Sequence, residues 1–190
     1  MTLPRDFYDR PVLDVARDLL GRQVSHGDVV LRLVEVEAYR GADDPGSHAF
    51  RGPTPRNTVM FGPPGHLYVY FTYGMHWCAN AVCGDEGVGV AVLLRAAVPL
   101  AGIDVMRASR PAARRDVDLC RGPARLCQAF GIDRSYDGAD LVDGDGGVII
   151  VDDGVAPPTE PVQTLRVGLS AGGEHPWRWY VAGDPNVSKR

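Results

Sequence analysis

The segment LRLVEVEAY places two carboxylates and a phenol at the end of an apolar stretch. Glu35, Glu37 and Tyr39 come at every second position, so in a strand they share a face, and Leu31 and Leu33 are expected on it too. We expect the Glu35 side chain to lie in water at an exposed edge. Glu37 is followed by an aromatic residue and a flexible loop, a pattern typical of a pocket mouth. The chemistry open to a carboxylate there is proton transfer.

A second segment, HLYVYFTYG, carries three tyrosines within six positions. Tyr68 and Tyr70 are expected on one face of a strand, and Tyr73 on the other unless the chain bends at Thr72 or Gly74. Two interpretations stay open. The tyrosines could simply favour a strand, or they could form a stacking platform for a planar ligand such as a nucleobase.

Charge is unevenly distributed along the chain. The net charge of -4 argues against a nucleic-acid partner, which usually meets a basic face. Arginines nevertheless gather between residues 107 and 125, and segregated charge can build a basic face on an acidic protein. Arg56, in the proline-rich loop PTPRN, could meet a phosphate or remain solvated. Lys189 is the only lysine, which leaves almost no room for a Schiff-base mechanism.

The elements that position these residues follow from periodicity and turn signals. Helices are predicted at 11–20, 100–108 and 123–130, and a loop rich in Gly and Pro at 43–64. Strands are predicted at 22–25, 29–39, 67–73, 77–82, 88–96, 148–151, 164–169 and 177–181. Hairpin-linked strands with few helices indicate a single α+β domain over residues 1–190 around an antiparallel sheet.

In order, these segments resemble the alkyladenine (3-methyladenine) DNA glycosylase family, in its compact bacterial form. The resemblance rests on LVEVEAYRG, DDPGSHAFRGPTPRN, MFGPPGHLYVYFTYGMHWCAN, AVLLRAAVPLAGIDVM, RGPARLCQAFGID, RVGL and WRWYVAGDPNVS. It covers the chain from about Asp6 to Ser188. It implies a curved antiparallel sheet or open barrel-like roll, with peripheral helices and a protruding β-hairpin. It also implies excision of alkylated or deaminated purines from double-stranded DNA, leaving an abasic site.

The resemblance also implies residue roles. Glu37 matches the residue that activates water, and Arg95 a residue that helps to position that water. The matches around the flipped base are Tyr39 and His48 on one face, Tyr70 on the other, and Asn80 as a residue bearing on which purines fit. Tyr73 matches the side chain that wedges into the duplex. The segment 170–176 fits loosely, which leaves the finer substrate preference open.

Two other functions stay open at this point: a damage-binding module without catalysis, and a small-molecule enzyme such as a nucleoside hydrolase. The first would not need Glu37, and the second would leave Tyr73 and the arginines without a role. No cofactor or metal is expected, because the spacing of Cys78, Cys83, Cys120 and Cys127 does not match common zinc sites and favours buried thiols. We expect a cytoplasmic, nucleoid-associated monomer without a membrane partner, since the first ten residues do not resemble a secretory signal and no apolar run is long enough to span a bilayer.

Overall fold

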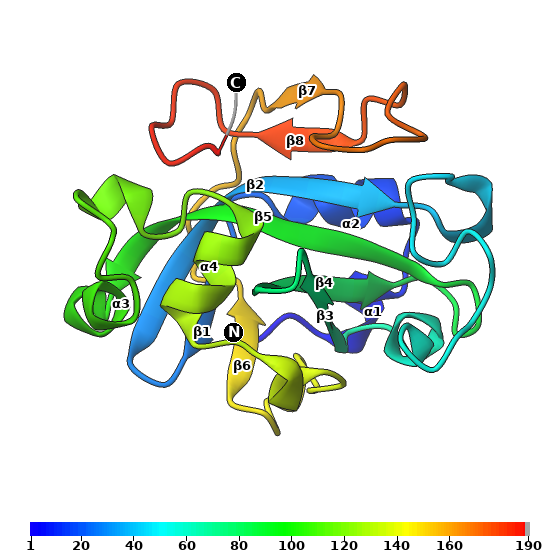
Figure 1. Ribbon diagram of the computed structural model, residues 1–190, viewed down its shortest axis with the longest axis horizontal. Coiled ribbons are helices and arrows are strands. Elements are labelled where there is room, and N and C mark those ends of the chain that lie inside the picture. Colours follow the sequence, from blue (N-terminus) through cyan, green and yellow to red (C-terminus); the bar gives the residue numbers. More distant parts are fainter. Residues whose placement is uncertain (189–190) are drawn as a thin grey trace.

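The computed structural model describes residues 1–188 and is built around one curled antiparallel sheet (Figure 1). The strands follow the order β3-β4-β5-β2-β1-β6, and β8 pairs with both β2 and β7. Their bounds are β1 Gln23–His26, β2 Val29–Tyr39, β3 Leu67–Thr72, β4 His76–Cys83, β5 Val90–Ala101, β6 Val148–Val151, β7 Val162–Thr164 and β8 Arg178–Tyr180. The sheet closes about half of a barrel, which confirms the expected α+β class.

Four helices accompany the sheet: α1 Arg5–Tyr8, α2 Val12–Leu19, α3 Ile103–Ser109 and α4 Pro123–Phe130. The helix α4 has its proline in the first turn and ends at Gly131, which takes the left-handed conformation that a glycine cap allows. In Figure 1, α4 lies in front of the sheet and α2 behind β2. Both helices pack against one hydrophobic core, which also takes in residues of β1, β6 and β8. The helix expected at 100–108 begins three residues later, because Leu100 and Ala101 still belong to β5.

The expected protruding hairpin is formed by β3 and β4, whose register pairs Leu67 with Ala81 and Thr72 with His76. Its turn places Tyr73 and Gly74 at positive φ, 51° and 66°. Such a backbone is strained for a tyrosine and natural for glycine. The turn leaves the Tyr73 side chain 83% exposed, and it supplies the bend that can bring Tyr73 to the same side as Tyr68 and Tyr70.

The alternation of β2 is interrupted by one extra residue, Val34, and the next shift of register is an extra residue in β5, Arg95, so one sequence prediction is wrong. Leu33 pairs with Ala97 and Val36 with Leu94, with shifts of register on both sides of Glu35. Leu31 and Leu33 therefore lie in the same core as Val36, and the face that carries Glu35 and Glu37 is the opposite one. Without the bulges, strict alternation would turn Glu37 into the core with the leucines. The bulges thus aim the two carboxylates away from it.

The strand expected at 164–169 is also wrong, because β7 ends at Thr164. Arg166 leaves the strand direction to make buried hydrogen bonds with Asp44 and with the carbonyls of Ala38 and Gly172. Tertiary contacts override the local β propensity here. The chain from 165 to 169 becomes a segment that crosses the sheet near Glu37 rather than a strand within it.

Candidate active site

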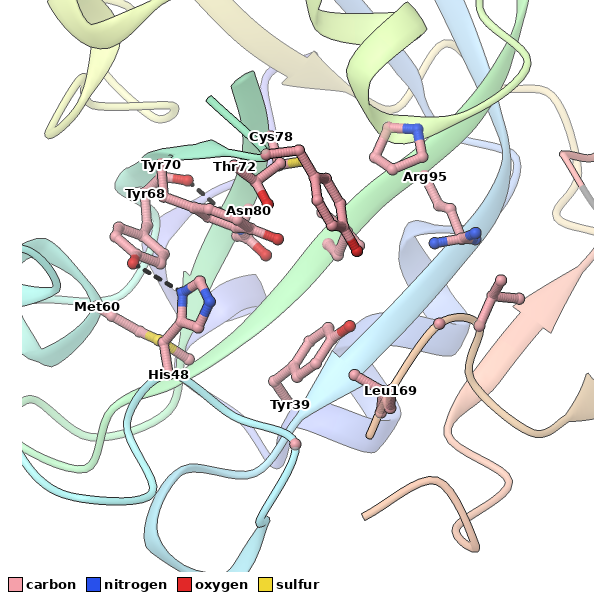
Figure 2. A pocket seen from close by; sticks show the side chains of 16 residues that line it. Tyr39, His48, Met60, Tyr68, Tyr70, Thr72, Cys78, Asn80, Arg95 and Leu169 are labelled. Atoms are coloured by element: carbon pink, nitrogen blue, oxygen red, sulfur yellow. Dashed lines mark hydrogen bonds between the residues drawn. The ribbon is translucent and has the colours of Figure 1, made fainter. Parts of the chain in front are cut away.

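A cavity of about 370 Å³ opens between the β3–β4 hairpin, the loop after β2 and the segment after β7. It is lined by Tyr39, Gly46, His48, Met60, Tyr68, Tyr70, Thr72, Tyr73, Cys78, Asn80, Leu93, Arg95, Pro123, Val167, Gly168 and Leu169. Figure 2 shows Tyr39 and Arg95 on one side, across from Tyr68 and Tyr70. The volume lies near the lower end of the range of about 300–1,000 Å³ typical of small-molecule sites. Six of the residues predicted from the sequence thus meet at one cavity: Tyr39, His48, Tyr70, Tyr73, Asn80 and Arg95.

Aromatic rings make up one side of this cavity. The rings of Tyr68 and Tyr70 are stacked with their centroids 5.6 Å apart. The His48 and Tyr70 rings form a T-shaped pair with their centroids 4.4 Å apart. The Nδ1 atom of His48 lies 3.1 Å from the Tyr68 hydroxyl, and the Asn80 amide donates to the Tyr68 carbonyl at 3.1 Å (Figure 2). Burial, together with the charge of Arg56, lowers the pKa of His48. The wall is therefore a rigid, neutral aromatic surface suited to a planar ring.

Glu37 lies directly behind the cavity wall and is fully buried. Its Oε2 accepts a hydrogen bond from the Tyr39 hydroxyl at 3.0 Å and a long one from Nη1 of Arg95 at 3.5 Å. Its Oε1 accepts the backbone N–H of Val167 at 2.8 Å. Each of these three donors belongs to a residue that lines the cavity. The carboxylate therefore has fixed partners, and all three of them also line the cavity.

Burial raises the pKa of Glu37 above the ordinary carboxyl value. The charge of Arg95 and the hydrogen bonds from Val167 and Tyr39 act in the opposite direction without outweighing burial, and the like charge of Glu35 adds to the rise. A carboxylate with a raised pKa holds a proton more firmly, which favours it as a general base near neutral pH. The neighbouring Tyr39 stays protonated because burial and the Glu37 charge raise the pKa of its phenol.

Glu35 is not solvated, and this corrects the expectation from the sequence. Its side chain is fully buried, and Oε1 accepts the Nε hydrogens of Arg95 at 2.9 Å and Arg178 at 2.7 Å. Its Oε2 accepts the backbone N–H of Ser188 at 2.7 Å. An exposed edge strand was the simplest interpretation of the sequence, but β8 pairs with β2 at this edge and Ser188 donates to Glu35. The signal in the sequence is an arginine inside each of two apolar segments, Arg95 in AVLLRAA and Arg178 in WRWYV, since such charges need a partner when they are buried.

An ion pair beside the cavity was not predicted from the sequence. Arg166 and Asp44 have completely buried side chains and share two hydrogen bonds, at 2.6 and 2.7 Å. The Arg166 guanidinium lies 4.7 Å from the ring centre of Tyr39. It thereby fixes both Tyr39 and the chain that carries Val167. An arginine inside the apolar motif RVGL was the signal, since such a charge is rarely buried without a partner.

Tyr73 and Arg56 lie at the hairpin that forms the cavity mouth. The exposed Tyr73 is at the tip, and Arg56 donates to the Phe71 carbonyl at 2.6 Å near the same turn. This hydrogen bond ties the proline-rich loop to the hairpin. Next to Tyr73, Met75 is 69% exposed, so the tip presents apolar surface to whatever approaches the cavity.

Some arginines of 107–125 form ion pairs and others do not. Arg107 and Arg115 are paired with aspartates, as a solvated surface would have them. Arg114 and Arg125 form no ion pair within residues 1–188, and with Arg110 and Arg115 they line a hollow whose only carboxylate is Asp118. The helix α4 contributes to both features, with Pro123 at the cavity and Arg125 at the hollow.

Nothing in residues 1–188 gathers three or more His, Cys, Asp or Glu side chains in a way that could hold a metal ion. All four cysteines are free and buried, in agreement with the sequence analysis. Cys78 is the one that lines the cavity, and burial raises the pKa of its thiol. Within the same residues, none of the helices has the length and apolar character needed to cross a bilayer.

Comparison with known proteins places this cavity in context. The family model described as methylpurine-DNA glycosylase (MPG) matches residues 6–185. A Burkholderia lata protein named "Putative 3-methyladenine DNA glycosylase" is 57% identical over 187 residues, covering 98% of this chain and 90% of its own length. Proteins of the same name from Streptomyces avermitilis and Carboxydothermus hydrogenoformans are 52% and 45% identical. The first covers 98% of this chain and 90% of its own length, and the second covers all of both chains.

Proposed function

The chain belongs to the methylpurine-DNA glycosylase family, and from this premise we propose which lesions it removes and how. It is a hydrolase of the 3-methyladenine DNA glycosylase type, acting in DNA repair. The proposed substrates are double-stranded DNAs that carry alkylated or deaminated purines: 3-methyladenine, 7-methylguanine and hypoxanthine. The proposed reaction is monofunctional, works in base excision repair at the nucleoid of the cytoplasm, and leaves an abasic site.

One observation carries the proposed mechanism: a fully buried carboxylate lies behind an aromatic cavity of small-molecule size. Glu37 contacts that cavity through Tyr39, Arg95 and Val167. A base inside a stacked duplex cannot reach such a site, so the nucleotide must be turned out of the helix. The unstacking costs a few kcal/mol, and least for a damaged or mispaired base.

In the proposed reaction, Glu37 accepts a proton from a water molecule as the water oxygen bonds to C1′ of the deoxyribose. The N-glycosidic bond breaks, and its electron pair leaves with the purine. The carboxylate also stabilises the positive charge that develops on the sugar. Arg95 contributes by helping to position the water. An alkylated purine with a formal charge leaves as a neutral base, so little acid catalysis is needed.

The cavity walls support the choice of purines. In the proposed complex, Tyr39 and His48 lie on one face of the base and Tyr70 on the other. Aromatic stacking contributes roughly 1–3 kcal/mol per base, and a cationic purine gains further from the electron-rich rings. Asn80 is buried at the cavity wall, where its amide can discriminate among purine edges.

The protein surface near the cavity supports a duplex partner. Tyr73 is proposed to fill the gap left by the flipped nucleotide, since it is exposed at the tip of a protruding hairpin. Arg56 and the arginine-lined hollow are proposed to contact the DNA backbone, because phosphates favour guanidinium groups. We further propose that the protein acts as a monomer.

The test is a gel assay on duplexes that each carry one of the three lesions, with a matched undamaged duplex and free nucleosides as further substrates. The proposal expects cleavage at the lesion after alkali and no adduct after borohydride. Lys189 is the only lysine and lies outside the described residues. Because a lysine Schiff base would have to form on it, the borohydride arm tests the monofunctional reaction directly. Tight binding without excision would instead indicate a damage-binding module. Hydrolysis of nucleosides alone would indicate a small-molecule enzyme.

A further inference from the structure

Glu35 has no role in the mechanism described so far, although its carboxylate is completely buried beside the catalytic groups. It accepts hydrogen bonds from Arg95, Arg178 and the backbone N–H of Ser188. Burying a carboxylate is costly unless it is fully paired. The Glu35 carboxylate is therefore held in one position by donors from β5, β8 and Ser188. One of these donors, Arg95, lines the cavity.

Arg95 is held by Glu35 more firmly than by Glu37. Its Nε lies 2.9 Å from Oε1 of Glu35, whereas its Nη1 lies 3.5 Å from Oε2 of Glu37. A guanidinium is planar, so an Nε hydrogen bond fixes the orientation of the whole group. We propose that Glu35 is a positioning residue. It holds the Arg95 guanidinium in the orientation in which this group donates a hydrogen bond to Glu37 and lines the cavity.

The consequence of losing Glu35 follows from this geometry. A released Arg95 would be free to pair with Glu37 through two close hydrogen bonds, the arrangement that guanidinium and carboxylate groups prefer. Glu37 would then be a weaker base. The rate of excision should fall on the order of 10–100-fold, by analogy with the loss seen when a partner that orients a metal-binding residue is removed.

The dependence on pH gives a readout that mere loss of stability would not change. The groups that face Glu37 are Tyr39 and Glu35 on its own strand, Arg95 on β5, Cys78 on β4 and the N–H of Val167. Glu35 raises the pKa of Glu37 and Arg95 lowers it. Removing the Glu35 charge and releasing Arg95 act in the same direction. The acidic limb of the rate profile should therefore move to lower pH.

The inference rests on the proposed function, and its test is single-turnover excision across pH by wild type, Glu35→Gln and Asp140→Asn. The substrate is the lesion that the wild type excises fastest. Asp140→Asn is the matched control, since Asp140 is also a buried carboxylate paired with an arginine, Arg5, but does not line the cavity. We expect Glu35→Gln to show the lower rate and the displaced limb, and Asp140→Asn to keep the wild-type limb. Wild type that excises nothing would refute the proposed function instead.

A double-mutant cycle separates positioning from a simple charge effect. In an Arg95→Met background, Glu35→Gln should lower the rate by much less than in wild type, because its action passes through Arg95. The inference would be overturned if the rate losses of Glu35→Gln and Arg95→Met simply multiply in the double variant. It would also be overturned if the acidic limb of Glu35→Gln coincides with that of wild type. If Glu35→Gln does not fold, Glu35→Asp takes its place. It keeps the charge and shortens the reach, so only the release of Arg95 acts. A slower rate and a limb displaced less than that of Glu35→Gln are expected, and a wild-type rate would overturn the inference.

Discussion

Replacing Asp44 with Asn tests how the segment over the active site is held. The change leaves the Arg166 guanidinium buried and removes its only counter-charge in residues 1–188. Breaking a buried ion pair from one side costs about 3–5 kcal/mol. Arg166 keeps two carbonyl acceptors, those of Ala38 and Gly172, so the loss should lie near the lower end, about 3 kcal/mol. For a chain of this size, that lowers Tm by about 6–12 °C.

The assay is denaturant unfolding at neutral pH, with Asp116→Asn as the matched control. Asp116 also receives two hydrogen bonds from one arginine, Arg107, both at 2.9 Å, but that pair is exposed. Its loss should cost much less than that of the Asp44 pair, because solvent screens an exposed ion pair. Equal losses in the two variants would refute the claim that burial makes the Asp44 pair strong.

Acid provides a second check on the same pair. Burial alone would raise the pKa of Asp44, but hydrogen bonds from Arg166, Arg40 and Gly46 outweigh it and hold this pKa below the ordinary value. A carboxyl with a lowered pKa contributes stability above its unfolded pKa of about 3.9 and loses it as the pH falls through the folded pKa. The difference between wild type and Asp44→Asn should therefore be constant near neutral pH and shrink below about pH 4. A difference that already shrinks between pH 7 and 5 would contradict this assignment.

Three further predictions concern the cavity and its mouth. Tyr39→Phe removes a hydrogen bond that lowers the pKa of Glu37, so the acidic limb of excision should move to higher pH; an unmoved limb in single-turnover profiles would speak against a role for this hydrogen bond. Tyr73→Ala should weaken excision of charged and neutral lesions alike, because the gap in the duplex does not depend on the base that left it, and a loss confined to one lesion in the same assay would assign Tyr73 to base recognition. Arg125→Glu should weaken binding to damaged and undamaged duplex together, and it should reduce the slope of log affinity against log salt concentration by about 0.9 for each phosphate that is no longer neutralised. Affinity and slope equal to wild type in a salt titration would remove the arginine-lined hollow from the DNA face.

The sequence was most informative where local patterns decide structure. The helix α4 lies where its proline and glycine place it, and the hairpin around Tyr73 follows from alternation and a glycine turn. Motif order brought Tyr39, His48 and Tyr70 to one cavity, although these residues lie far apart in the chain. Their roles toward a flipped base remain predictions.

The errors share one physical cause, which is long-range packing. Strict alternation placed Glu37 on the face of Leu31, because a bulge has no clear signature in a single strand. Glu35 was expected in water because nothing local shows that β8 covers it. The segment around Arg166 was predicted as a strand because its partner Asp44 lies more than a hundred residues away.

The most direct test of the account is Glu37→Gln, measured for excision and for binding to the same damaged duplex. The amide keeps the size of the side chain and removes the base. General-base catalysis typically contributes about 10²–10⁴-fold, so excision should fall by at least that order. Binding to the damaged duplex should persist, because the aromatic cavity and the hairpin are unchanged. Wild-type turnover by Glu37→Gln would contradict the central claim that this buried carboxylate activates the water.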